Sequence, residues 1–132
     1  FWATWCGPCI ASFPTMQKAM EEYEAKNGDV VFLFINTWEN VENKEENAAN
    51  FIEKNNYPFE VLMDTENEVV QAFKIDGIPT KFIVDKNNRI RFKSVGYNNN
   101  EEKVLSELRM MIDLAAKASD DTASLNNQMG GN

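Results

Sequence analysis

Both cysteines of this 132-residue chain lie near its start, as Cys6 and Cys9 with Gly7 and Pro8 between them. In the first turn of a helix, side chains three residues apart lie on one face, within the span of a disulfide bond. Aromatic residues precede the pair and a helical pattern follows it, a context in which a Cys-x-x-Cys motif indicates redox chemistry. The helix N-terminus favours an anion, so we expect Cys6 to be an exposed, attacking thiolate with a lowered pKa and Cys9, one turn deeper, to be the resolving thiol.

Two other uses of the cysteines remain open at this point. A permanent disulfide would close a very short loop and stabilise little, and a chain of this length can bury a core without it. A zinc site would need carboxylates beside the two thiolates, because the chain has no histidine. The absence of histidine also removes the commonest general base and every Cys-His nucleophile pair. We therefore expect no metal.

The elements that must position the cysteines follow from the apolar pattern. Residues 1–3 read as the end of a buried strand, and a helix is expected from Gly7 to the Asn-Gly-Asp stop at residues 27–29, kinked by Pro14. Its apolar face would contain Ile10, Phe13, Met16, Met20 and Tyr23.

Further elements alternate along the chain. Strands are expected at residues 30–35, 59–63, 80–85 and 90–95, and helices at residues 45–55, 66–73 (capped by Asp64 and Thr65) and 100–118. This order predicts an α/β sandwich with a mixed central sheet. We expect one domain over residues 1–118 and a disordered tail over residues 119–132, which holds few apolar residues. A net charge of −8 argues against a nucleic-acid partner, and no apolar run is long enough to span a membrane.

Several of these residues together resemble the thioredoxin superfamily. They are WCGPC at residues 5–9, Pro14 five residues after the second cysteine, GIPT at residues 77–80 and KFIVD at residues 81–85. The expected strand at 59–63 and helix at 66–73 form an insertion similar to that of the TlpA/ResA branch of bacterial thiol-disulfide oxidoreductases. The resemblance covers residues 1 to about 118 and implies a three-layer α/β/α sandwich.

The resemblance also implies roles for residues outside the motif. Pro79 would be the cis-proline opposite the cysteines, exposing the Ile78 backbone for strand-like pairing with substrate. Glu39 in the segment INTWE (residues 35–39) would take the proton of Cys9, although a solvated loop glutamate in an acidic run is the open alternative. The expected substrate-binding residues are Trp5, Gly7, Pro8, Ile78 and Thr80.

The other tryptophans are ambiguous. Trp2 either walls the active-site surface or belongs to the core alone, and Trp38 is either a rim aromatic or a packing residue. In the family a strand and a helix precede the motif, and the strand that enters it is central. Here only residues 1–3 of that strand are present, between the expected strands 30–35 and 80–85. We expect an upstream segment or another copy of the chain to fill the gap, as unpaired strand edges are costly.

The resulting prediction is a thiol-disulfide oxidoreductase that reduces protein disulfides. We expect no cofactor beyond the Cys6–Cys9 disulfide, and as partners protein disulfides and an upstream thiol donor. The resemblance to the TlpA/ResA branch implies a periplasmic or otherwise extracytoplasmic location, with a membrane anchor in preceding sequence. The alternative is a thioredoxin-like binding or structural domain without turnover. A peroxiredoxin fits poorly, because Ala3 and Cys6 stand where a threonine would precede the reactive cysteine by three residues.

Overall fold

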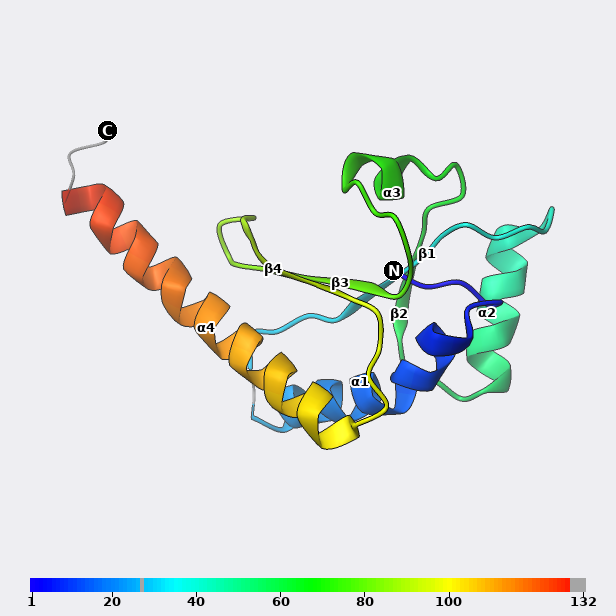
Figure 1. Ribbon diagram of the computed structural model, residues 1–132, viewed down its shortest axis with the longest axis horizontal. Helices are drawn as coiled ribbons and strands as arrows, with labels where there is room; N and C mark the ends of the chain where they lie inside the picture. The colour runs from blue at the N-terminus through cyan, green and yellow to red at the C-terminus, as the bar shows by residue number, and fades with distance from the viewer. Residues whose placement is uncertain (27, 129–132) are drawn as a thin grey trace. The chain divides into compact units, whose positions relative to one another are not determined.

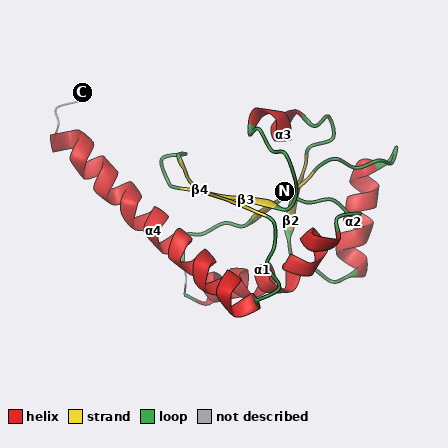
Figure 2. Cartoon of the chain, in the orientation of Figure 1, coloured by secondary structure: helices red, strands yellow, loops and turns green. Residues whose placement is uncertain are grey.

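Helices and strands alternate along the chain as the sequence predicts (Figures 1 and 2). The computed structural model describes residues 1–26 and 28–128, with side chains through residue 117. The elements are α1 (Gly7–Ala25), β1 (Leu33–Asn36), α2 (Lys44–Lys54), β2 (Glu60–Met63), α3 (Glu68–Ala72), β3 (Thr80–Val84), β4 (Ile90–Val95) and α4 (Glu101–Gln128). The chain divides into two compact units: Phe1–Thr80 with Val95–Asn99, and Lys81–Ser94 with Asn100–Asn132.

The strands of the described residues pair in twos. β1 and β2 are parallel, with Leu33 opposite Glu60 and Asn36 opposite Met63, and β3 pairs with β4. The mixed sheet is thus interrupted where the sequence predicts a gap, at the strand that enters the Cys-x-x-Cys motif. The segment that would join them contributes one bridging residue, Trp2, opposite Asn36, which is too little for a strand.

That entering segment is nevertheless held on both sides. The Trp2 N–H donates to the Ile35 carbonyl and the Trp2 carbonyl accepts from the Thr37 N–H, each at 2.9 Å. The Phe1 nitrogen donates to the Thr80 carbonyl at 3.0 Å. The segment thus lies beside the end of β1 and reaches the first residue of β3, as the family resemblance implies.

Aromatic packing attaches α1 to β1 and β2. The Phe13 ring lies edge-on to four other rings at centroid distances of 5.1–5.8 Å, those of Trp2, Phe34, Tyr57 and Phe59. Phe59 in turn stacks on Phe34 at 3.9 Å and on Tyr57 at 5.1 Å. Edge-to-face and stacked pairs add to the free energy of apolar burial, so this cluster fixes where α1 begins relative to the strands.

α3 begins two residues later than expected, and its predicted cap acts from outside the helix. The N-cap residue is Asn67, with a left-handed backbone (φ 57°) and no capping hydrogen bond from its side chain. The Asp64 carboxylate instead accepts from the N–H groups of Val69 and Val70 at 3.0 and 3.1 Å. It also accepts from the Thr37 hydroxyl at 2.9 Å, which ties α3 to the end of β1.

The second unit contains residues 81–94 of the β3–β4 hairpin, and α4. α4 extends through Gln128, beyond the expected end at residue 118, because adding residues to a helix that is already nucleated costs little. Residues 129–132 of the expected tail lie outside the described residues, and the domain boundary at residue 118 stays a prediction. In this unit, burial lowers the pKa of Lys81 from its ordinary value, while Glu107 opposes the shift.

Replacing Asp64 tests its role in holding α3. Asp64→Ala would leave the N–H groups of Val69 and Val70 without their acceptor and remove the shorter hydrogen bond of the Thr37 hydroxyl, so we expect the free energy of unfolding to fall by about 3 kcal/mol. Chemical denaturation measures this, with Asp29→Ala as the control, because Asp29 is exposed and its replacement should change stability by about 0.5 kcal/mol or less. Equal effects of the two substitutions would contradict the assignment.

Candidate active site around Cys6 and Cys9

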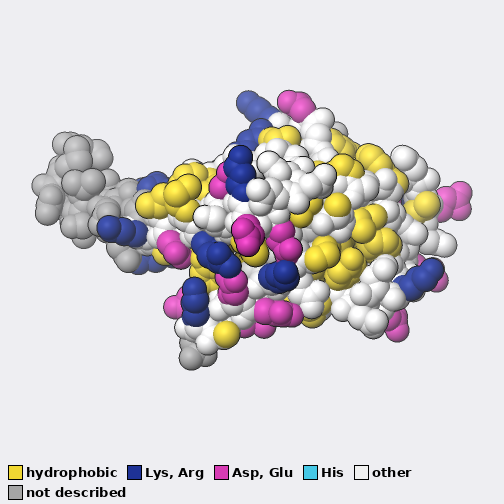
Figure 3. All heavy atoms as spheres, turned by 60° about the horizontal axis from the view of Figure 1, so that its bottom comes forward, with side chains coloured by type: hydrophobic (Ala, Val, Ile, Leu, Met, Phe, Trp, Pro, Cys, Tyr) yellow, Lys and Arg dark blue, Asp and Glu magenta, His cyan; other side chains and the backbone are white. Residues whose placement is uncertain are grey.

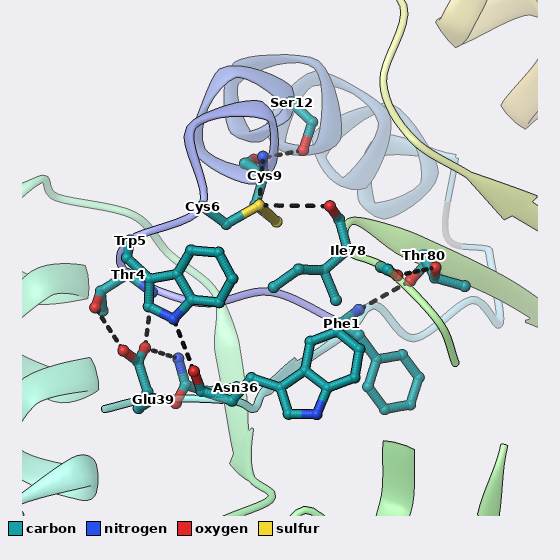
Figure 4. Close-up of a disulfide and its surroundings, with 12 residues drawn as sticks. Phe1, Thr4, Trp5, Cys6, Cys9, Ser12, Asn36, Glu39, Ile78 and Thr80 are labelled. Atoms are coloured by element: carbon teal, nitrogen blue, oxygen red, sulfur yellow. Dashed lines mark hydrogen bonds between the residues drawn. A yellow bond between two sulfur atoms is a disulfide. The ribbon is translucent and has the colours of Figure 1, made fainter. Parts of the chain in front are cut away.

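The cysteine pair forms the start of α1. Cys6 is the N-cap residue, with an extended backbone (φ −88°, ψ 99°), and its sulfur accepts the Cys9 N–H at 3.3 Å. Pro8 occupies the first turn, where its missing N–H is not needed. The two sulfurs are joined in a disulfide with a Cα–Cα distance of 5.3 Å (Figure 4). A Cys6 thiolate formed on reduction would keep this N–H donor and the positive end of the helix dipole.

The expectation of an exposed Cys6 is wrong for this disulfide form. Cys6 is 3% exposed and Cys9 0%. Gly7 and Pro8 between them are exposed, and Trp5 before them is 55% exposed. The surface at the disulfide is therefore made by Trp5, Gly7 and Pro8, three of the expected substrate-binding residues, while the sulfurs lie beneath it.

The Ile78–Pro79 loop reaches the disulfide, although Ile78 is 72 residues after Cys6 in the sequence. The Ile78–Pro79 peptide bond is cis, and the Ile78 carbonyl oxygen lies 3.7 Å from the Cys6 sulfur. Pro79 is buried, and its carbonyl accepts the Gly96 N–H at 2.7 Å. The structure thus brings GIPT to the cysteines, with a carbonyl facing the sulfur.

Thr80 faces away from the surface that a substrate could contact. Its side chain is buried, at 1% exposure, and its hydroxyl donates to the Gly77 carbonyl at 2.6 Å. This hydrogen bond closes the turn that carries Ile78 and Pro79. The Thr80 side chain therefore supports this turn, and a contact of Thr80 with substrate stays a prediction.

Glu39 is buried at 6% exposure, so it is not a solvated loop residue. Its carboxylate accepts three hydrogen bonds, from the Thr4 N–H (2.7 Å), the Thr4 hydroxyl (2.7 Å) and the Asn36 side-chain amide (2.8 Å). Figure 4 shows it pointing at Thr4, two residues before Cys6. Of the other glutamates in the acidic run, Glu42, Glu45 and Glu46 are exposed, as a solvated face requires. Of these four glutamates, Glu39 is the one that is hydrogen-bonded to the segment that carries the motif.

The three tryptophans differ in whether they lie in the core or at the surface of the site. Trp2 is 2% exposed and packs against Phe13 and Phe51, so it is a core residue. The Trp5 indole N–H donates to the Trp38 carbonyl at 2.7 Å. We call the exposed Trp5 side chain, together with the Trp38 backbone that it contacts, the rim of the site.

Asn67 supports this rim from the start of α3. Trp38 has a left-handed backbone (φ 52°), which is uncommon for a bulky residue, and its N–H donates to the Asn67 side-chain oxygen at 3.1 Å. The same oxygen lies 3.3 Å from the Thr37 hydroxyl. Asn67 therefore holds the backbone whose carbonyl orients Trp5.

Thr4, Asn36 and Asn67 support the site but are not among the residues predicted for it from the sequence. Thr4 and Asn36 hold Glu39, and Asn67 holds Trp38. A signal existed for the first two, because each is a polar residue at the end of an apolar, strand-like run, where a buried side chain needs a partner. Asn67 carried no such signal, because its acceptor serves a backbone N–H.

The described part of the chain contains no cluster of three or more His, Cys, Asp or Glu side chains that could hold a metal ion. None of its helices combines the length and apolarity that crossing a membrane requires. The face in Figure 3 mixes acidic, basic and hydrophobic side chains.

Comparison with known proteins agrees with this geometry. The family model Redoxin matches residues 1–109. Thiol-disulfide oxidoreductase ResA of Bacillus cereus is 26% identical over 102 residues, which are 77% of this chain and 56% of ResA. ResA of Oceanobacillus iheyensis is 34% identical over 90 residues, which are 68% and 44% of the two chains. The chain thus spans about half the length of these curated relatives.

A solved structure extends the comparison to the fold. The Chlorobium tepidum chain assigned as thiol:disulfide interchange protein DsbE has a TM-score of 0.69 and 27% identity, covering 85% of this chain and 76% of its own. The fold is thus the thioredoxin-like α/β fold. Given the match over residues 1–109, this chain belongs to the Redoxin family.

Proposed function

We propose that this chain is a thiol-disulfide oxidoreductase whose Cys6–Cys9 pair exchanges with disulfides of protein substrates. The observation that carries the proposal is the position of Cys6, as N-cap of α1 with its sulfur on the Cys9 N–H and 3.7 Å from the Ile78 carbonyl. A structural disulfide needs neither a helix N-terminus nor a facing carbonyl. A thiolate, in contrast, is stabilised by the helix N-terminus, and the backbone of a docking substrate can pair with the Ile78 backbone.

Reduction of a substrate would proceed by two exchange steps. The Cys6 thiolate attacks one substrate sulfur, a mixed disulfide forms, and the other substrate sulfur leaves as a thiolate that takes a proton from water. Cys9 then loses its proton and attacks the Cys6 sulfur, which forms the Cys6–Cys9 bond and releases the second substrate thiolate. The substrate gains two electrons and the cysteine pair loses them, so no further cofactor is needed. A donor dithiol restores the pair by the same exchange in reverse.

Glu39 is our candidate for the group that takes the proton of Cys9. Among the described residues, the buried carboxylates are Glu39, Asp64 and Asp85. Asp64 is engaged by the N–H groups of α3, and Asp85 by the N–H groups of Asn87 and Arg89. Glu39 is the one bonded to the segment that leads into Cys6.

Substrate would dock over the exposed residues Trp5, Gly7 and Pro8, with its backbone along Ile78. Protein disulfides that could serve as substrates persist outside the reducing cytosol, and the resemblance to the TlpA/ResA branch leads us to place the protein in an extracytoplasmic compartment. By resemblance that compartment is the periplasm, with the chain held by a membrane anchor in preceding sequence. We also propose that a preceding segment or a second copy of the chain pairs with the strand edges beside Trp2.

One observation favours the alternative of a binding domain without turnover, namely the 3% exposure of Cys6. Reduction of insulin by dithiothreitol separates the two functions. We expect the protein to accelerate the reaction and Cys6→Ser to abolish the acceleration. Cys9→Ser should accumulate a mixed disulfide with substrate, because it retains the attacking thiol and lacks the resolving one. Equal rates with wild type and Cys6→Ser would favour the binding domain.

The rim predicts a distinction between large and small substrates. Asn67→Gly keeps the left-handed backbone but removes the acceptor for the Trp38 N–H. The Trp38 carbonyl that orients Trp5 is then no longer held in place. We expect KM for a protein disulfide to rise by about fivefold, the equivalent of one hydrogen bond, with little change for a small-molecule disulfide. Asn67→Asp, which keeps an acceptor, is the matched control. Equal changes in KM for both substrates would contradict a role of the rim in docking.

A further inference from the structure

The two oxygens of the Glu39 carboxylate have different partners. Oε2 accepts from two nitrogen donors, the Thr4 N–H at 2.7 Å and the Asn36 side-chain amide at 2.8 Å. The hydrogen bond to Oε1 comes from the Thr4 hydroxyl, at 2.7 Å. Figure 4 shows these three bonds converging on Glu39 from Thr4 and Asn36.

This difference decides which oxygen can take a proton. A backbone N–H and an amide NH₂ can only donate, so a proton on Oε2 would face two donors and break at least one hydrogen bond. A hydroxyl can donate or accept. If Oε1 takes the proton, the Thr4 hydroxyl can rotate and accept from it, and the contact between the two residues survives.

A third residue keeps the Thr4 oxygen in place during such a rotation. The Asn47 side-chain amide on α2 donates to Thr4 Oγ1 at 3.1 Å. The oxygen has two lone pairs, enough to accept from Asn47 and from a protonated Glu39 together. Thr4 is only partly buried, so its own hydrogen can then turn toward water.

We propose that Thr4 is a positioning residue for proton transfer from Cys9. It presents Glu39 Oε1 as the accepting atom, and its hydroxyl reverses its hydrogen bond when Glu39 takes the proton. The inference rests on the proposed function. The Cys9 S–H bond breaks and the Oε1–H bond forms, directly or through water, and the Cys9 sulfur attacks Cys6 as the substrate thiolate leaves. Glu39 then returns the proton to that thiolate or to water.

A single-turnover experiment isolates this step. Reduced protein attacks 5,5′-dithiobis(2-nitrobenzoate) through Cys6, which releases one thionitrobenzoate, and Cys9 then releases the second. Thr4→Val keeps the N–H and the side-chain shape but lacks the hydroxyl. We expect it to slow the second release by about tenfold, the effect of one hydrogen bond to a charged group. We expect the first release to stay within about twofold, because that step does not use Glu39.

Three further variants separate positioning from structure. Thr4→Ser restores the hydroxyl and should recover most of the second rate and its pH profile. Glu39→Gln should slow the second release, and Thr4→Val should add nothing in that background, because the two residues act as one unit. If Thr4→Val does not fold, Thr4→Ala removes the same hydroxyl.

The outcomes distinguish this inference from the proposed function. If wild-type protein releases no second thionitrobenzoate, the proposed function fails. If wild type releases it and Glu39→Gln slows it, but Thr4→Val does not, the inference about Thr4 is overturned and the function stands. Equal slowing of both releases by Thr4→Val and Thr4→Ser would mean a structural role and would also overturn the inference.

Discussion

The backbone pairing of Trp2 with the end of β1 is the constraint on which the site depends. Two hydrogen bonds of 2.9 Å fix Trp2 beside Ile35 and Thr37. The chain then turns, with the Cys6 N–H on the Ala3 carbonyl at 3.1 Å, and enters α1. Because Thr4 lies within this turn, the same pairing that sets the helix start also sets Thr4 against Glu39. The position of the disulfide and the position of the buried carboxylate therefore have one cause.

Burial of a carboxylate is costly unless donors satisfy it, and this cost explains the polar residues around the motif. The Glu39 carboxylate accepts three hydrogen bonds, from Thr4 and Asn36. The Asp64 carboxylate also accepts three, from Thr37, Val69 and Val70. Asp64 serves the fold by holding α3. Glu39 caps no helix, and its partners lie in the segment leading to Cys6. Its attachment to that segment makes Glu39 a candidate for a role in the chemistry of the cysteines.

The sequence predicts the parts of this site that depend on spacing and apolar pattern. The Cys-x-x-Cys spacing and the face containing Phe13 and Met16 are enough to place the disulfide at the start of α1. The segment INTWE contains Glu39, which is buried and whose role stays a prediction, and the motif GIPT places a cis-proline at residue 79. These features are local, or are marked by a motif whose residues can be recognised.

Features that depend on backbone groups or on tertiary packing could not be predicted in this way. The partner of the Trp5 indole is a carbonyl, which leaves no trace in the side-chain sequence. Burial of Cys6 and the inward turn of Thr80 follow from how distant segments meet.

The reduction potential of the Cys6–Cys9 pair tests whether this pair exchanges with substrate disulfides, since a pair that does so must be reducible by thiols. It can be measured by equilibrating the protein, together with any segment that precedes it, in dithiothreitol buffers and separating the oxidised and reduced forms. We predict one two-electron transition, above about −300 mV, where labile and catalytic disulfides lie. A pair that stays oxidised to well below about −300 mV, as structural disulfides do, would contradict it.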